Sequence, residues 1–319
     1  AEHDTGDQQT LYLSADHIHV QATGLYEIGS SFFRLGGKTF VIDEIHKYIE
    51  WRQEVKNLHD AFPETKIYFS GSSTLSLQRG KGDLSRRAVY YSLPGLSFRE
   101  YLSFAHGLAF KPASLPDLLK NHAALASRIL KEGPILGRFR DYLDHGVYPF
   151  FLEGVHLYHN KLSNVIEKVL YEDIPAATAT KTANVPAMKR MLWLIATSQP
   201  FTPNIEKMAR DLKISKPTIY TYLDFLERAM LLSGFLPAET GYRLVRKPSK
   251  IYMENTNLLR QIAGELGTRE QTGTVRETFF AHQVKSAGMS LSIPKYGDFQ
   301  VDNNLLFEIG GKGKGGHQL

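Results

Sequence analysis

The feature that most constrains this chain is a run of four apolar or β-branched residues, 39–42, that leads directly into two adjacent carboxylates, Asp43 and Glu44. Such a run is typical of a strand that is buried on both faces of a parallel sheet. A protein core does not accept unpaired carboxylates, so we expect the acidic pair to lie outside the core, at the carboxyl end of that strand. Open α/β sheets bind ligands at this edge. The alternative is a strand that ends in a solvated Asp-Glu turn.

Two further predicted strands end in polar residues. The first ends in Asp16, and the third ends in Ser70, with Ser72 close behind. The alternation of strand and helix predicts a parallel sheet and an α/β fold. The convergence of polar strand ends at one edge suits a phosphate and metal site, and it favours a nucleotide hydrolase over a solvated turn. The strands are predicted at 10–16, 39–44 and 66–70, and the helices at 23–35 and 48–62.

In a nucleotide hydrolase, the first acid of such a pair holds Mg²⁺ directly or through water, and the second orients or polarises the attacking water. This is the pattern of a Walker B strand. The triplet Gly37-Lys38-Thr39 looks like the end of a P-loop. The P-loop pattern, however, requires glycine where this chain has Phe32, and a helix where Thr39 opens a strand. We therefore interpret the glycines at 36 and 37 as a turn.

Four segments carry a resemblance to a known family: 12–16, 40–46, 69–73 and 93–102, of which the last is the most distinctive. In them the sequence resembles the prokaryotic AAA-type ATPases of the AAA+ superfamily that carry a C-terminal domain of unknown function with a restriction-nuclease-like core. The resemblance implies a P-loop NTPase-type parallel sheet at 1–105, a helical lid at 106–184, a winged helix-turn-helix at 185–245 and a small α/β nuclease-like domain at 246–319.

The same resemblance assigns a site. It implies ATP and Mg²⁺ as cofactors, Asp43 as the Mg²⁺-associated acid and Glu44 as the catalytic one. Ser70 or Ser72 would lie near the sensor position that detects the γ-phosphate, and Arg87 would touch that phosphate. The alternative for Arg87 and its neighbouring arginine is a solvated basic pair.

Members of this family place a strand, a P-loop and a helix, roughly 30 residues in all, ahead of the strand that here begins at Thr10. We expect that the sequence is an N-terminally trimmed piece rather than a copy that has lost ATP binding. A buried Asp-Glu pair beside an empty nucleotide site would otherwise cost stability. By itself, the chain is expected not to hydrolyse ATP.

The middle of the chain is predicted to be helical. Ser215 is placed to cap a helix and Pro217 to lie in its first turn, which predicts a helix-turn-helix with a wing hairpin at 235–246. His145, beside Asp144, is assigned no role. The helices are predicted at 118–130, 135–143, 188–196, 204–212 and 215–232.

If the helix-turn-helix binds DNA, then Lys216, Thr218, Tyr220 and Thr221 would face the groove. Recognition helices usually carry more positive charge than this one, in which two acids follow within a few residues. The alternative is a winged helix that joins two domains.

Two predicted strands near the C-terminus carry acids, Asp298 and Asp302 in the first and Glu308 in the second. With Glu277 and Lys312 they resemble the D…E-x-K core of restriction-type nucleases, in which the acids bind Mg²⁺ and the lysine positions the attacking water. The residue two after Glu308 is glycine, so Lys312 could serve only if the strand bulges. We expect a vestigial, inactive nuclease site, or a plain hairpin with a loose basic tail.

Composition limits the kinds of partner, metal site and location that the chain can have. A net charge of +5 and a pI near 9.1 permit a polyanion such as DNA without requiring one. The absence of cysteine excludes disulfides and thiolate metal sites. No apolar stretch or leader suggests a membrane or export, so we expect a cytoplasmic protein, with self-association as a further expectation. The rivals to an ATPase are a DNA-binding or protein-interaction module on an inactive ATPase scaffold, and a metal-dependent nuclease.

Overall fold

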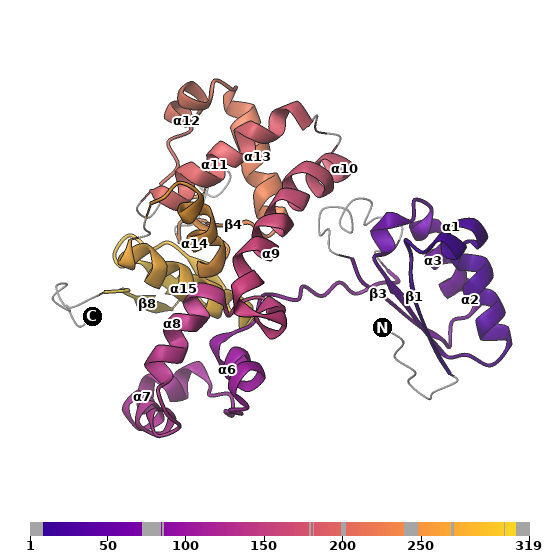
Figure 1. The fold of residues 1–319 in the computed structure, drawn as a ribbon, viewed down its shortest axis with the longest axis horizontal. Helices are drawn as coiled ribbons and strands as arrows, with labels where there is room; N and C mark the ends of the chain where they lie inside the picture. The colour runs from indigo at the N-terminus through magenta and orange to yellow at the C-terminus, as the bar shows by residue number, and fades with distance from the viewer. Residues whose placement is uncertain are drawn as a thin grey trace. The chain divides into compact units, whose positions relative to one another are not determined.

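A computed structural model describes residues 9–71, 84, 86–178, 180, 182–198, 202–238, 248–268, 271–302 and 304–310. The chain divides into two compact units (Figure 1). Unit 1 comprises Ala1–Ser92 with Glu172–Thr180, and unit 2 comprises Leu93–Tyr171 with Lys181–Leu319. Each unit has its own sheet and helices.

Unit 1 is built on a parallel sheet of three strands in the order β1-β2-β3, as the alternating pattern predicted. The strands are β1 (Thr10–Ser14), β2 (Thr39–Asp43) and β3 (Lys66–Phe69). The register places Ser14 beside Asp43 and Ile42 beside Phe69, so the three strands end together. The mixed α/β class is therefore confirmed for this unit.

One face of this sheet is covered by helices. Phe40 and Ile42 of β2 are fully buried and belong to the same apolar cluster as Leu25 and Leu58 of the helices. The residue between them, Val41, is only half-buried, and its neighbours across the sheet, Tyr12 and Tyr68, are exposed. The expectation of a strand buried on both faces is therefore wrong in the described residues. The helices are α1 (Ile18–Thr23), α2 (Leu25–Arg34) and α3 (Trp51–Ala61).

The helix predicted at 23–35 is interrupted. Gly24 adopts φ 92°, a conformation that ends α1 and allows α2 to start in a new direction. The carboxylate of Glu54 on α3 accepts a hydrogen bond from the Tyr26 amide at 2.8 Å, which satisfies one of the free donors at the start of α2. A glycine between two helices thus has a structural role that periodicity alone did not indicate.

The first half of unit 2 is helical. Its first helix begins with a capping box in which Ser97 and Glu100 satisfy each other's backbone donors, within the segment that most resembled the AAA-type family. The predicted helices at 118–130 and 135–143 are present with longer bounds. The elements are α6 (Phe98–His106), α7 (Leu115–Leu130), α8 (Ile135–His145), the 3-10 turn η2 (Pro149–Glu153) and α9 (Val155–Lys168).

Beyond α9 the chain continues through a π-helical turn, η3 (Val169–Asp173), to α10 (Ile174–Thr178) and the short η4 (Thr182–Asn184). Three helices follow, α11 (Val185–Thr197), α12 (Ile205–Leu212) and α13 (Lys216–Arg228). As predicted, the Ser215 side chain caps α13 by accepting a hydrogen bond from the Thr218 amide, and Pro217 lies in the first turn.

Helix α13 ends at Arg228, earlier than the predicted residue 232. Met230 adopts φ 59°, which no helix tolerates, and the chain then enters β4 (Leu232–Phe235). This strand pairs antiparallel with β5 (Lys250–Met253). The predicted wing hairpin at 235–246 falls largely on residues outside those that the structure describes, so the winged helix stays a prediction.

The C-terminal part joins helices to a small antiparallel sheet. Phe299 of β7 is fully buried and packs with Phe235 and Tyr252 from the β4-β5 pair. The sheet order is β6-β7-β8. The elements are α14 (Thr256–Glu265), α15 (Thr272–Ser286), β6 (Leu291–Ser292), β7 (Phe299–Val301) and β8 (Leu305–Phe307). No helix in the described ranges has both the length and the apolar character that a bilayer span requires.

Candidate functional site

The carboxyl edge of the parallel sheet in unit 1 gathers the predicted acid and serine. Asp43 is the last residue of β2, and its Oδ2 accepts a hydrogen bond from the Tyr12 hydroxyl at 3.0 Å. Its Oδ1 accepts a hydrogen bond from the hydroxyl of Ser70, which directly follows β3. One carboxylate is thus held by donors from both neighbouring strands, as the convergence of strand ends predicted.

These donors favour the ionised form of Asp43. The hydrogen bond from Ser70, helped by those from Tyr12 and the Glu44 backbone, holds the pKa of Asp43 below its ordinary value despite partial burial. The hydrogen bond between Tyr12 and Asp43 also raises the pKa of the Tyr12 hydroxyl, because this hydroxyl donates to an anion. At neutral pH, Asp43 is a fixed negative charge at the sheet edge.

Glu44 follows with an unusual backbone. Its φ of 48° and ψ of 36° lie in the left-handed region, which is strained for a residue with a long side chain. It precedes the 3-10 turn η1 (Ile45–Lys47), whose first amide donates to the Ser70 carbonyl oxygen at 2.9 Å. The Glu44 side chain is 30% exposed, and its Oε2 lies 3.4 Å from Nε2 of His46. The second acid is therefore accessible but anchored.

The other predicted residues of this site contact groups other than the Asp43 carboxylate, or lie outside the described ranges. Asp16 accepts a hydrogen bond from the Ser14 hydroxyl at 2.7 Å. Arg87 binds both carboxylate oxygens of Asp60, at 2.7 and 3.1 Å. Asp60 lies in the last turn of α3, the helix that leads back toward the start of β3, so this pairing holds the guanidinium away from the carboxyl edge. Ser72 lies outside the described residues.

The donors at this edge suit Mg²⁺, because carboxylate and hydroxyl oxygens are the ligands this ion prefers. Among the described residues, no group of three or more His, Asp or Glu side chains could hold a metal alone. A Mg²⁺ ion held by one or two carboxylates together with nucleotide phosphates needs no such group. Asp43 would hold it, with Ser70 and Glu44 beside that carboxylate.

Two of the predicted nuclease residues lie around a lysine. Glu277 on α15 is buried, accepts a hydrogen bond from the Tyr252 hydroxyl at 2.6 Å and lies 3.8 Å from Lys250 Nζ. Asp298 lies 3.4 Å from the same Nζ, and its other oxygen accepts a hydrogen bond from the Ile309 amide. An ammonium group thus occupies the place between the two acids that a metal ion would need.

Among the remaining predicted nuclease residues, Asp302 contacts a different part of the chain. The Asp302 carboxylate accepts hydrogen bonds from the amide and hydroxyl of Ser290, and Glu308 is exposed beyond β8. Lys312 lies outside the described residues. Sequence analysis had assigned no role to Lys250, because nothing in its local pattern shows that two acids 27 and 48 residues later approach it.

The residues predicted to face DNA lie in the first half of α13. Lys216 Nζ forms an ion pair with Glu206 Oε1 at 2.5 Å, and the Thr218 hydroxyl contacts that of Ser215. The Thr221 hydroxyl donates to the Pro217 carbonyl within the helix. Tyr220 is 41% exposed. The one lysine of the predicted set is therefore paired with an acid, which reduces the positive charge on this face.

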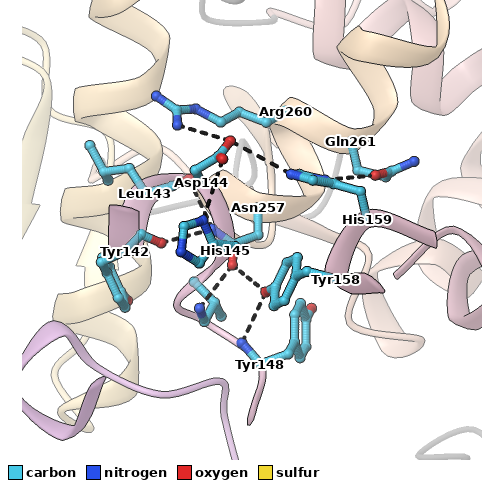
Figure 2. A network of polar contacts seen from close by, with 11 residues as sticks. Tyr142, Leu143, Asp144, His145, Tyr148, Tyr158, His159, Asn257, Arg260 and Gln261 are labelled. Carbon is cyan, nitrogen blue, oxygen red and sulfur yellow. Dashed lines mark hydrogen bonds and ion pairs between the residues drawn. The ribbon is translucent and has the colours of Figure 1, made fainter. Parts of the chain in front are cut away.

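Unit 2 has a concave site that the sequence did not predict. A cavity of about 620 Å³ lies between α8, α9 and α14. At its wall, Asp144 contacts Arg260 at 3.2 Å, His145 at 3.4 Å and His159 at 3.7 Å (Figure 2). The lining residues are Asp144, His159, Arg260, Gln261, Gly264, Glu265 and Thr268.

The charges of this cavity are paired with one another. The hydrogen bond with His145, followed by the charges of Arg260 and His159, lowers the pKa of Asp144 to about 2. His159 also contacts Gln261 Oε1 at 3.0 Å, as Figure 2 shows. Asp144 is therefore the counter-ion of Arg260, with the rings of His145 and His159 beside it. Nothing in the local sequence could have revealed it, because Arg260 lies 116 residues away.

Two models of known protein families match parts of this chain. The model of the AAA domain family matches residues 1–102, and that of a domain of unknown function (DUF8612) matches residues 136–270. The first match makes residues 1–102 similar, at the family level, to AAA-type, ATPase-like domains. All residues that line the unit 2 cavity lie within the second match.

A relative is the uncharacterized protein MJ1637 of Methanocaldococcus jannaschii, which is 28% identical over 261 residues. The alignment covers 76% of this chain and 53% of the relative, so the chain spans about half the length of the protein it resembles. No solved structure matches the chain at a significant level. The nuclease-like interpretation of the C-terminal part stays a prediction.

Proposed function

We propose that this protein is an AAA-type ATPase that binds and hydrolyses ATP with Mg²⁺ and uses the reaction to move its C-terminal domains. The observation that carries the proposal is the arrangement around Asp43, whose carboxylate is held by Tyr12 and Ser70 at the common end of three parallel strands. Parallel α/β sheets bind ligands at this edge.

Each residue of the edge has a role in this proposal. Asp43, held ionised, would be the Mg²⁺-associated acid; bound Mg²⁺ would neutralise phosphate charge. Glu44 would orient the attacking water and accept its proton as the water oxygen bonds to the γ-phosphorus and the bond to the bridging oxygen of ADP breaks. Ser70, which contacts Asp43 through its hydroxyl and the η1 turn through its carbonyl, would detect the γ-phosphate.

The test is Mg²⁺-ATP binding by calorimetry, together with steady-state hydrolysis. Both are measured on the 319-residue chain and on a version extended upstream by about 40 residues, the length of a P-loop unit with a margin. We expect Glu44→Gln to retain ATP affinity and to lose turnover by about 100-fold or more. Glu64→Gln is a matched control, because Glu64 is an exposed acid in the turn before β3.

If neither version binds ATP, the proposal is wrong and the scaffold hypothesis takes its place. DNA titration would then follow, with Lys216→Ala as the informative variant. The ion pair of Lys216 with Glu206 gives no specific support to DNA binding, so we do not advance it as a second function.

A further inference from the structure

The second acid of the pair lies next to a histidine to which the proposed function gives no role. His46 lies two residues after Glu44, in the η1 turn. Its side chain is only 6% exposed, and its Nε2 lies 3.4 Å from Glu44 Oε2. A charged or polarised N–H at this distance attracts a carboxylate, although the contact is longer than an ordinary hydrogen bond.

Two features of the backbone bring the side chains of His46 and Glu44 together. Glu44 is in the left-handed region, so the chain turns sharply and brings the side chain at 46 back toward the one at 44. The turn is fixed from both sides, because the Ile45 amide donates to the Ser70 carbonyl and the Lys47 amide donates to the Glu44 carbonyl, each at 2.9 Å. A strained backbone persists only where its surroundings hold it.

Glu44 is an acidic contact of the His46 ring. The charge of His46 also acts on Asp43, whose two carboxylate oxygens accept hydrogen bonds from Tyr12 and Ser70. The imidazole is thus packed in place while the Glu44 carboxylate remains partly open to solvent. A buried side chain beside a partly exposed carboxylate can hold a general base in position and still leave it accessible to water.

We propose that His46 is a positioning residue that holds the Glu44 carboxylate in place at the carboxyl edge, and that η1 links this carboxylate to Ser70 on the third strand. The catalytic part of this inference rests on the proposed ATPase function. The contact itself does not, and it can be tested in the chain without nucleotide.

The first measurement is a double-mutant cycle on the unfolding of the 319-residue chain, with His46→Ala, Glu44→Gln and the combination of both. Residues in contact give non-additive effects, whereas distant residues give additive ones. We expect the double variant to lose less stability than the sum of the two single losses. His122→Gln, a change at an exposed histidine on α7, should be additive with Glu44→Gln.

The second measurement is hydrolysis by the version extended upstream. His46→Ala should lower kcat by about 10- to 100-fold, because a displaced base loses catalysis, while KM and ATP affinity stay within about twofold. His46→Gln, which retains an N–H donor, should recover most of the rate. In the Glu44→Gln background, His46→Ala should cause little further loss.

The outcomes separate the two proposals. Additive effects in the unfolding cycle overturn the His46 inference whether or not the protein hydrolyses ATP. Non-additive effects without hydrolysis support the contact and contradict the ATPase. If hydrolysis occurs and His46→Ala raises KM with kcat unchanged, His46 does not position the base, and the inference is wrong.

Discussion

The side-chain oxygen of Asn257 on α14 accepts a hydrogen bond at 2.8 Å from the backbone amide of Val147, which lies 110 residues earlier in the sequence. The same oxygen accepts a hydrogen bond from the Tyr158 hydroxyl, and the amide nitrogen donates to the carbonyls of Tyr142 and Leu143 (Figure 2). Asn257 is fully buried, so one side chain satisfies the end of α8, the start of the following loop and a tyrosine of α9.

Asn257→Ala should therefore destabilise unit 2. The change leaves a buried amide, a hydroxyl and two carbonyls without this partner, and each unsatisfied buried group costs about 1–3 kcal/mol. We expect a loss of about 3 kcal/mol in the free energy of unfolding, measured with urea and followed by helical circular dichroism. Asn160→Ala, at an exposed position of α9, should change stability by less than about 0.5 kcal/mol. Equal effects of the two changes would contradict the role given to Asn257.

Acid should destabilise the protein through His282. This histidine of α15 is buried, and burial, reinforced by the nearby Lys285 charge, lowers its pKa to about 4. The unfolded chain binds the proton near pH 6.5, and the folded one only near pH 4. Stability from this group is therefore complete above about pH 6.5 and falls as the pH is lowered toward 4, by up to about 3 kcal/mol.

The check on His282 is the pH dependence of urea unfolding between pH 7 and 4. His282→Leu should remove this part of the slope, since leucine binds no proton, although it also changes the packing beside Gly95. The difference in slope between variant and parent is the informative quantity, because carboxylates titrate in both. His122→Gln should keep the parent slope. An unchanged slope in His282→Leu would show that the acid sensitivity arises elsewhere.

Arg87 provides a test of the sensor assignment. Its guanidinium binds Asp60 through two hydrogen bonds, and this contact lowers the pKa of Asp60. If that pairing is its role, Arg87→Ala and Asp60→Asn should have the same small effect on stability and no effect on ATP affinity or kcat. A loss of turnover in Arg87→Ala alone would show that the arginine leaves Asp60 to reach the phosphate. Calorimetry and steady-state hydrolysis distinguish these outcomes.

Local sequence signals predicted the elements of unit 1 and the start of α13 within a few residues. Strands β2 and β3 were evident from apolar runs with polar ends, and Ser215 and Pro217 marked the first turn of α13. The errors at Val41 and Met230 arise because a local pattern does not show what packs against an element or follows it. The burial of Val41 depends on what covers the other face of the sheet, and the left-handed backbone of Met230 depends on the turn into β4.

The residues of the candidate site could be predicted because they lie at the ends of strands, and local sequence patterns mark strand ends. The same local patterns do not show contacts between distant elements. Asp43 ends β2, and Glu44 and Ser70 directly follow β2 and β3, whose parallel pairing places their ends together. The His46 contact, the Asp144 cluster and the Asn257 network were not evident, because they depend on a sharp turn or on partners about a hundred residues away. Periodicity describes one element at a time, whereas these contacts belong to the packing between elements.

The cluster around Lys250 supports a last prediction. Its ammonium lies between Glu277 and Asp298, and the three side chains are at most 18% exposed. Removal of one partner from a buried ion pair leaves an uncompensated charge, which costs about 3–5 kcal/mol. We expect Lys250→Met to lower the free energy of unfolding of unit 2 by about 3 kcal/mol, measured with urea at pH 7.

The combination of Lys250→Met with Glu277→Gln should recover part of that loss, because only one of the two acids then lacks its counter-charge and the Tyr252 hydroxyl still finds an acceptor. Lys295→Met, at an exposed position before β7, is the control and should be nearly neutral. If Lys250→Met were equally neutral, Glu277 and Asp298 would have to be neutralised in another way. A divalent cation would then be the first alternative to test, by calorimetric titration of the variant with Mg²⁺ and Mn²⁺, and binding there would revive the nuclease hypothesis.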